Sequence, residues 1–300
     1  MKKRFMGNAM LLSAAMIWGA SFVAQTVGMD YVGPFTFQAV RCFLASLVLL
    51  PVIALMDKKG NDKKPVTAAA KKDQLIYGLL CGIVLFAACS LQQIGLQYVE
   101  AGKAGFITSL YIILVPIAGL LFGQKIKPWV LGSVLLALVG LYLLCATDMR
   151  IGKGELLVLA CAVAYTAHIL IIDKVSARLD GVRLSCMQFF VVAMISTAAM
   201  FLWEAPSVGS ILLCWLPICY SGVLSAGVGF TFQIIGQAYT EPTVASLLMS
   251  LESVFSMLFG WLLLNQKLSA TEIFGCSLVF LGVIIAQLPG KKSKFEKIPA

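Results

Sequence analysis

Ten stretches of mostly apolar residues, each near the length that crosses a bilayer, follow one another along this chain of 300 residues. A membrane-spanning helix needs about 20 such residues. The chain is 60% hydrophobic and only 12% charged, whereas soluble domains average about 45–50% apolar and 25% charged residues. The sequence therefore predicts an all-α integral membrane protein with ten transmembrane helices, over residues 8–27, 35–56, 75–98, 105–123, 129–146, 154–172, 185–203, 212–237, 243–264 and 270–288.

The lysines and arginines between these stretches are unevenly distributed. If the N-terminus lies in the cytoplasm, 18 of the 23 basic residues fall on the cytoplasmic side, four on the other side and one, Arg41, within a span. Basic residues collect on the cytoplasmic side of membrane proteins. We therefore expect a multi-pass protein of the cell membrane with both termini cytoplasmic. The net charge of +9 then reflects orientation, and no nucleic-acid partner is indicated.

The two halves of the chain are similar in sequence. Residues 92–100 read QQIGLQYVE and residues 233–241 read QIIGQAYTE, so that Gln, Gly, Tyr and Glu recur at one spacing. Each half has five predicted helices, an odd number, so the second half enters the membrane from the opposite side. We therefore expect two inverted five-helix repeats, at 1–147 and 148–300. Inverted repeats recur in secondary transporters.

Several motifs in these helices point to a known family. They are Trp18-Gly19 with Phe22, Arg41, LVPIAGLLFGQK at 114–125 and ASLLMSLESVFSMLFGWLLLNQK at 245–267. In these motifs, and over nearly its whole length, the chain resembles the EamA-type transporters of the drug/metabolite transporter superfamily. The resemblance implies a secondary transporter of small organic metabolites, often amino acids or their relatives, usually moved outward. The chain has no GxxxxGK[ST] loop for binding ATP.

One carboxyl group, that of Glu252, lies near the middle of the ninth predicted helix. It follows Thr243 by nine residues, or about 14 Å of helix, in a hydrocarbon core about 30 Å thick. A charge at that depth costs about 2.5–3.5 kcal/mol on insertion scales, so such a residue usually has a partner or a function. Glu252 is therefore the first candidate for binding a proton or a cation. The alternative is a structural role, with a hydrogen bond to Ser256 or to a neighbouring helix.

Other polar and aromatic side chains in the predicted helices are candidates for lining a cavity. Aromatic side chains with a polar tip can bind organic solutes or cations, and amides within a membrane must face polar partners. The single histidine of the chain could relay protons or bond a substrate, or only pack. With the first candidate included, the predicted cavity residues are Glu252, Tyr111, Trp18, Tyr165, His168, Gln92 and Gln233.

Two further residues are interpreted as structural. Arg41 lies about 9 Å from the outer end of the second helix. It is about 7 Å from Glu252 along the membrane normal, so we expect it to pair with that carboxylate or to reach the outer interface. Pro116 is expected to break the fourth helix and to free a backbone carbonyl that a cavity could use, or else only to kink the helix.

The residue content also limits the classes of function. No Cys or His cluster has the spacing of metal ligands, so we expect neither a metal nor another cofactor. A single histidine without clustered carboxylates does not indicate an enzyme. The expected partners are a small-molecule substrate and the lipid bilayer; a monomer suffices to enclose a cavity, and a dimer is possible. The alternative function is a multidrug exporter of lipophilic cations, which a carboxylate among aromatic rings would also suit.

Overall fold

The computed structural model describes residues 2–58, 68–121, 123, 126–145, 152–264 and 269–287, and all regular structure within these ranges is helical. Eight helical stretches there are long and apolar enough to cross a membrane, and two shorter apolar helices complete a set of ten. The predicted all-α membrane fold is therefore confirmed. Seven spans are single helices: α1 (Lys2–Gly28), α2 (Pro34–Lys58), α3 (Ala68–Gly95), α6 (Pro128–Cys145), α7 (Lys153–Ser176), α8 (Gly181–Trp203) and α14 (Ala270–Gln287).

Spans four and nine are each divided into two helices. Span four consists of α4 (Ala101–Thr108) and α5 (Tyr111–Leu121), and span nine of α12 (Pro242–Met249) and α13 (Leu251–Leu264). The two breaks lie at matching positions of the repeats, 141 residues apart.

The break in span four is not where the sequence predicts it. Pro116 lies within α5, and the helix is interrupted earlier, at Ser109 and Leu110. There the backbone tightens into bonds between residues three apart, with the Ile112 amide 3.0 Å from the Ser109 carbonyl oxygen. The expectation that Pro116 breaks this helix is therefore wrong.

Serine side chains account for the matching break in span nine. The hydroxyls of Ser246, Ser250, Ser253 and Ser256 each donate to the carbonyl oxygen three residues earlier, at 2.7–2.9 Å. Such bonds compete with the helical pattern and bend helices. The sequence thus contains a feature that favours a bend here, in four serines at spacings of three and four residues.

Span eight departs most from a regular helix. It consists of α10 (Trp215–Cys219), the π-helix η1 (Tyr220–Phe230) and α11 (Thr231–Gln237), and a separate short helix, α9 (Val208–Leu213), precedes it. Extended π-helices are rare and often occur at functional sites. The interruption between α9 and α10 is at Cys214, and Pro217 lies within α10.

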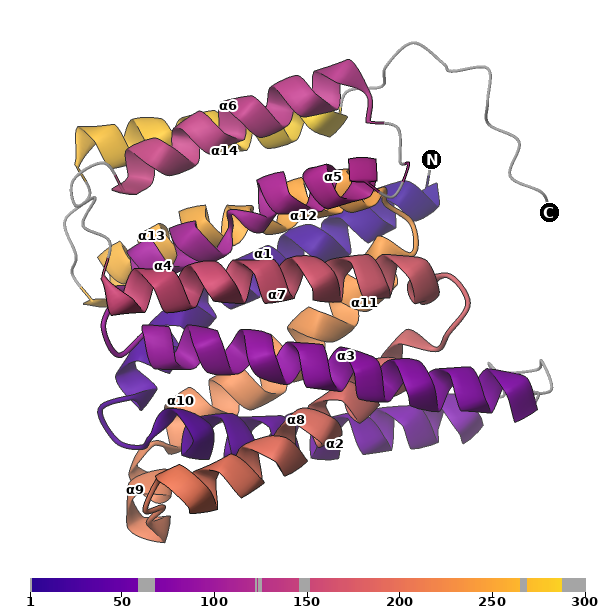
Figure 1. The fold of residues 1–300 in the computed structure, drawn as a ribbon, viewed down its shortest axis with the longest axis vertical. Coiled ribbons are helices and arrows are strands. Elements are labelled where there is room, and N and C mark those ends of the chain that lie inside the picture. Colours follow the sequence, from indigo (N-terminus) through magenta and orange to yellow (C-terminus); the bar gives the residue numbers. More distant parts are fainter. Residues whose placement is uncertain are drawn as a thin grey trace.

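Contacts between helices recur at matching positions of the two halves. Figure 1 shows α6 with α14 at one edge of the molecule and α2 with α8 at the other. Between these edges α1 packs on α13, and its counterpart α7 packs on α4 and α5. Matching hydrogen bonds recur as well: Gln38 Nε2 donates to Ser90 Oγ at 3.1 Å, and Thr231 Oγ1 donates to Ser185 Oγ at 2.9 Å.

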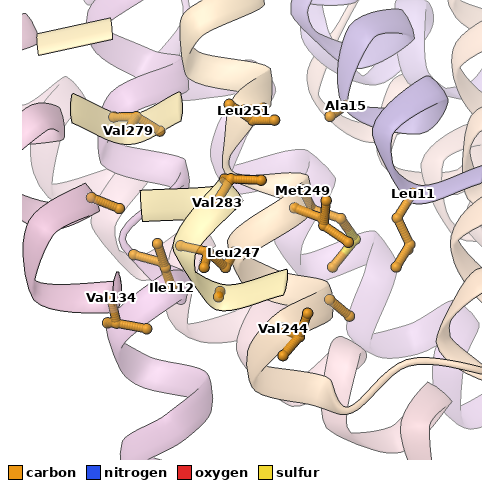
Figure 2. Close-up of a cluster of buried hydrophobic side chains, with 14 of the residues drawn as sticks. Leu11, Ala15, Ile112, Val134, Val244, Leu247, Met249, Leu251, Val279 and Val283 are labelled. Carbon is orange, nitrogen blue, oxygen red and sulfur yellow. The ribbon is translucent and has the colours of Figure 1, made fainter. Parts of the chain in front are cut away.

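Small residues allow the α6–α14 pair to approach closely. A Cβ added to Gly140 would lie 2.6 Å from the Gly275 carbonyl oxygen, and one added to Gly282 would lie 2.8 Å from that of Ser133. These contacts also match between the halves. Beside this pair, apolar side chains of α5, α6, α12 and α14 form a core, in which Figure 2 shows Ile112, Val134, Leu247 and Val283 together.

Candidate functional site

A cavity lies between the two halves of the chain, among helices of spans one to four and six to nine. It encloses about 570 Å³ of space between atoms, including its open mouth. Helices α6 and α14 contribute none of its lining residues.

Six of the seven predicted cavity residues line this cavity, and they form three pairs at matching repeat positions. Trp18 and Tyr165 come from spans one and six, 147 residues apart, and the other two pairs are 141 residues apart. Each half therefore contributes one member of every pair: Trp18 with Tyr165, Gln92 with Gln233, and Tyr111 with Glu252.

Tyr111 and Glu252 are in direct contact. The Tyr111 hydroxyl donates to Glu252 Oε1 at 2.9 Å, and the two residues are 3% and 4% exposed. Each lies in the first turn after the break in its span, so the breaks bring them together. Glu252 also lies at the N-terminal end of α13, where backbone N–H groups favour negative charge. Ser256, the partner suggested by the sequence, instead bonds to the Ser253 carbonyl.

Trp18 is held by the π-helix of span eight. Its Nε1 donates to the Ser225 carbonyl oxygen at 3.2 Å, and its ring lies 4.7 Å from that of Phe230. Gly229 makes room for the indole, because a Cβ there would lie 2.8 Å from Trp18 Nε1. The π-helix thus supplies both a carbonyl acceptor and a close approach.

Tyr165 and Gln92 are linked in the wall of the cavity. The Tyr165 hydroxyl lies 3.3 Å from Cys89 Sγ and 3.5 Å from Gln92 Oε1. The Gln92 amide donates from Nε2 to Thr108 Oγ1 at 3.2 Å. Gln233, the counterpart of Gln92, has a buried Oε1 without a hydrogen-bond partner. Gln233, a residue of the cavity lining, therefore has a buried acceptor that no described group uses.

His168 does not line the cavity. Its ring is fully buried, and its Nε2 lies 3.0 Å from Oε1 of Gln188 on α8. The ring of Phe230, which does line the cavity, lies 6.0 Å from the imidazole. The position of His168 therefore corresponds to the packing alternative.

Arg41 lines the cavity but does not pair with Glu252. Its Nη1 donates to Gln25 Oε1 at 2.8 Å, and its guanidinium lies 5.5 Å from the centre of the Phe37 ring. The residue is only 5% exposed, so it does not extend to an interface either. Both expectations for Arg41 are therefore wrong: it neither pairs with Glu252 nor reaches the outer interface.

Several lining residues were not singled out by the sequence analysis. They include Ser21, Gln25, Thr108, Ser225 and Phe230. The glycines at 222, 227 and 229 are a sequence signal for an irregular span eight. Of the parts of the chain that the structure describes, none brings together three or more His, Cys, Asp or Glu residues that could hold a metal ion. The cavity instead offers a carboxyl group, a guanidinium, amides and aromatic rings.

Comparisons with known proteins agree on one family. The sequence profile of the EamA-like transporter family matches residues 5–146 and 152–287. A protein of Archaeoglobus fulgidus, named as an uncharacterized transporter, is 32% identical over 95% of this chain and 87% of its own length. A chloroplastic WAT1-related protein of Arabidopsis thaliana is 23% identical over 95% of this chain and 70% of its own length.

One solved structure shows the same fold. A crystal structure at 20% sequence identity superposes with a TM-score of 0.75, covering 94% of this chain and 96% of its own.

Proposed function

The chain belongs to the EamA-like transporter family, and from this premise we propose that it exports small organic metabolites such as amino acids by alternating access. Its relatives are named transporters, so the protein is a transporter and not an enzyme. The observation that carries the proposal is the cavity between the halves, lined by three pairs of repeat-related residues. A site shared in this way can be exposed to either side when one half moves against the other.

The proposed moving units are the repeats at 1–147 and 148–300. The family profile matches the chain in two segments, 5–146 and 152–287, which supports this division. We propose that both termini are cytoplasmic and that the protein resides in the cell membrane, because 18 of 23 basic residues then face the cytoplasm. A single chain encloses the cavity, so a monomer suffices for transport.

Glu252 is the proposed coupling group. Among the described residues that line the cavity it has the only carboxyl group, and Tyr111 donates a hydrogen bond to it. A carboxyl group at this depth can bind a proton or the amine of a substrate. If Glu252 takes up and releases a proton in each transport cycle, transport is coupled to the proton gradient through this residue.

A second candidate function rests on a different feature of the same cavity. Trp18, Tyr111, Tyr165 and Phe230 place aromatic rings around the carboxyl group of Glu252. Aromatic faces attract cations, and more strongly where water is excluded. This arrangement favours export of lipophilic cations as the alternative.

Counterflow in proteoliposomes tests the proposal. Purified protein is reconstituted, the vesicles are loaded with one unlabelled compound, and entry of the labelled compound is followed. The panel contains the twenty common amino acids, other small metabolites and tetraphenylphosphonium, each with and without a pH gradient. Exchange of an amino acid or another small metabolite supports the first candidate, and exchange of the phosphonium alone supports the second. No exchange of any compound contradicts both.

A further inference from the structure

Arg41 is a buried cation in the cavity wall, and none of the residues that the structure describes is its anionic partner. It is 5% exposed, it lines the cavity, and its Nε has no hydrogen-bond partner. Within the described ranges, no carboxylate lies within 4.0 Å of its guanidinium. The titratable side chains that interact with it are the thiols of Cys42 and Cys89 and the phenol of Tyr165. A buried charge is costly unless it is paired.

The guanidinium is held in place by a chain of hydrogen bonds. Gln25 Nε2 donates to the carbonyl oxygen and the hydroxyl of Ser21, at 3.2 and 3.3 Å. This leaves Gln25 Oε1 as the acceptor for Arg41 Nη1, at 2.8 Å. The Gln25 carbonyl oxygen is 3.4 Å from Gln93 Nε2. Arg41 is therefore oriented by neutral groups, which fix the guanidinium without neutralising it.

In the second half of the chain, the position that matches Arg41 has a purely structural role. Arg41 is seven residues after the start of α2, and Gln188 is seven residues after the start of α8. Gln188 is fully buried, bonds His168 at 3.0 Å and does not line the cavity. A neutral amide therefore suffices to link two helices at this position. Helix packing alone does not require the charge of Arg41.

The cavity also contains an acidic side chain, at a different place from Arg41. Glu252 lines the same cavity and is bonded to Tyr111, not to Arg41. An acid and a guanidinium that share a cavity without pairing can be bridged by a ligand that carries both charges. Arg is well suited to the carboxylate end, because its planar N–H groups match two carboxylate oxygens.

We propose that Arg41 binds the carboxylate of the substrate, so that the cavity selects zwitterions with a carboxylate at Arg41 and an amine toward Glu252. This inference rests on the proposed function and narrows its substrate class to amino acids and close analogues. It also argues against lipophilic cations, which would bring a further positive charge to Arg41.

Matched ligands separate the two ends of the zwitterion. For each amino acid, the amide removes only the carboxylate charge and the N-acetyl derivative removes only the amine charge. Counterflow measures transport, and the ligand-induced rise in unfolding temperature of the detergent-purified protein measures binding. The variants are Arg41→Gln, which copies the residue of the second half, and Arg41→Lys, which keeps the charge but loses the two-pronged geometry. Gln188→Met serves as the control at the matching position.

We expect wild type to prefer at least one amino acid over its amide by about 100-fold, as charge-assisted hydrogen bonds allow. Arg41→Gln should reduce this preference to about threefold or less, with Arg41→Lys intermediate. Gln188→Met should lower the unfolding temperature and leave the preference unchanged. If Arg41→Gln does not fold, a reduced preference for the amino acid over its amide in Arg41→Lys tests the proposal instead.

Counterflow tests the transport proposal, and ligand binding tests the anion site, so either proposal can be contradicted without the other. Binding that depends on Arg41 without counterflow would contradict the transport proposal and support the anion site. Equal responses to amino acids and amides in wild type, or an unchanged preference in the Arg41 variants, would overturn the anion site. Exchange of other compounds would in that case leave the transporter proposal intact.

Discussion

The Tyr111 hydroxyl donates a hydrogen bond to the Glu252 carboxyl group at 2.9 Å, and the two residues occupy the same position in the two repeats. Two residues before each of them, the Ser109 hydroxyl lies 3.4 Å from the Ser250 carbonyl oxygen, again between matching positions. Residues that correspond in two related halves can touch only near the axis that relates the halves. The broken helices of spans four and nine therefore cross at the pseudo-twofold axis, and the cavity lies beside it.

Removing the Tyr111 hydroxyl leaves the Glu252 carboxyl group without its tyrosine partner. We expect Tyr111→Phe to lower the free energy of unfolding by about 1–3 kcal/mol, the typical cost of an unsatisfied buried polar group, and to slow transport. Unfolding in detergent and counterflow are the measurements. Tyr142→Phe is the control, because Tyr142 is 51% exposed on α6. Equal behaviour of the two variants would exclude an energetic role for this hydrogen bond.

Replacing Glu252 by Gln removes the ionisable group and keeps an oxygen that can accept from Tyr111. We expect Glu252→Gln to lose accumulation of substrate driven by a pH gradient. Exchange at equal pH should continue, but at higher substrate concentrations, because the substrate amine loses its carboxylate partner. Glu100→Gln changes an exposed carboxylate and should behave as wild type. Accumulation by Glu252→Gln that follows the pH gradient normally would rule out proton coupling through this residue.

Gly19 is required for the close approach of α1 to α13. An added Cβ would clash with Phe255 Cβ and would lie 2.8 Å from the Ser256 amide nitrogen. We expect Gly19→Ala to cost about 1–3 kcal/mol or more through overpacking, seen as a lower unfolding temperature. Gly132→Ala is the control, since no atom lies within 4 Å of a Cβ there. That variant should gain about 0.5–1 kcal/mol from helix propensity, so a similar gain in Gly19→Ala would contradict the contact.

Glu204 caps the N-terminus of α2 from the end of α8. Its carboxylate accepts from the amides of Phe35 and Thr36 at 2.8 Å each, and from the Thr36 hydroxyl at 2.6 Å. We expect Glu204→Ala to lower the free energy of unfolding by about 1–2 kcal/mol, as the loss of a helix cap does. Asp30→Asn alters an exposed carboxylate in the α1–α2 connection and should have little effect. A cap that contributes nothing would leave both variants at the wild-type unfolding temperature.

Much of the fold could be predicted from the sequence because crossing a membrane is a local requirement. Each span must be apolar over about 20 residues and must satisfy its backbone hydrogen bonds internally. Both properties can be recognised in a short window. The QQIGLQYVE and QIIGQAYTE segments then indicate which spans correspond. The polar and aromatic character of the side chains was enough to place Trp18, Tyr165, Gln92 and Gln233 among the cavity candidates.

Side-chain partners were predicted less well. Arg41 bonds Gln25 rather than Glu252, and His168 faces Gln188 rather than the cavity. Ser21, at the matching position of the first half, does line the cavity. Identical placement along related helices therefore produced different surroundings, because the neighbouring residues differ between the halves: Gln188 in the second half corresponds to Arg41 in the first.

The sequence by itself determined that the chain is a membrane protein of ten helices in two related halves, since apolar length and repeated spacing are properties of the chain alone. The tertiary structure decided which polar groups meet: the contact of Tyr111 with Glu252, the bond from Trp18 to the Ser225 carbonyl of the π-helix, and the unpaired Nε of Arg41. Each of these depends on how helices distant in sequence rotate and pack, and the free energy of such packing is shared among many residues.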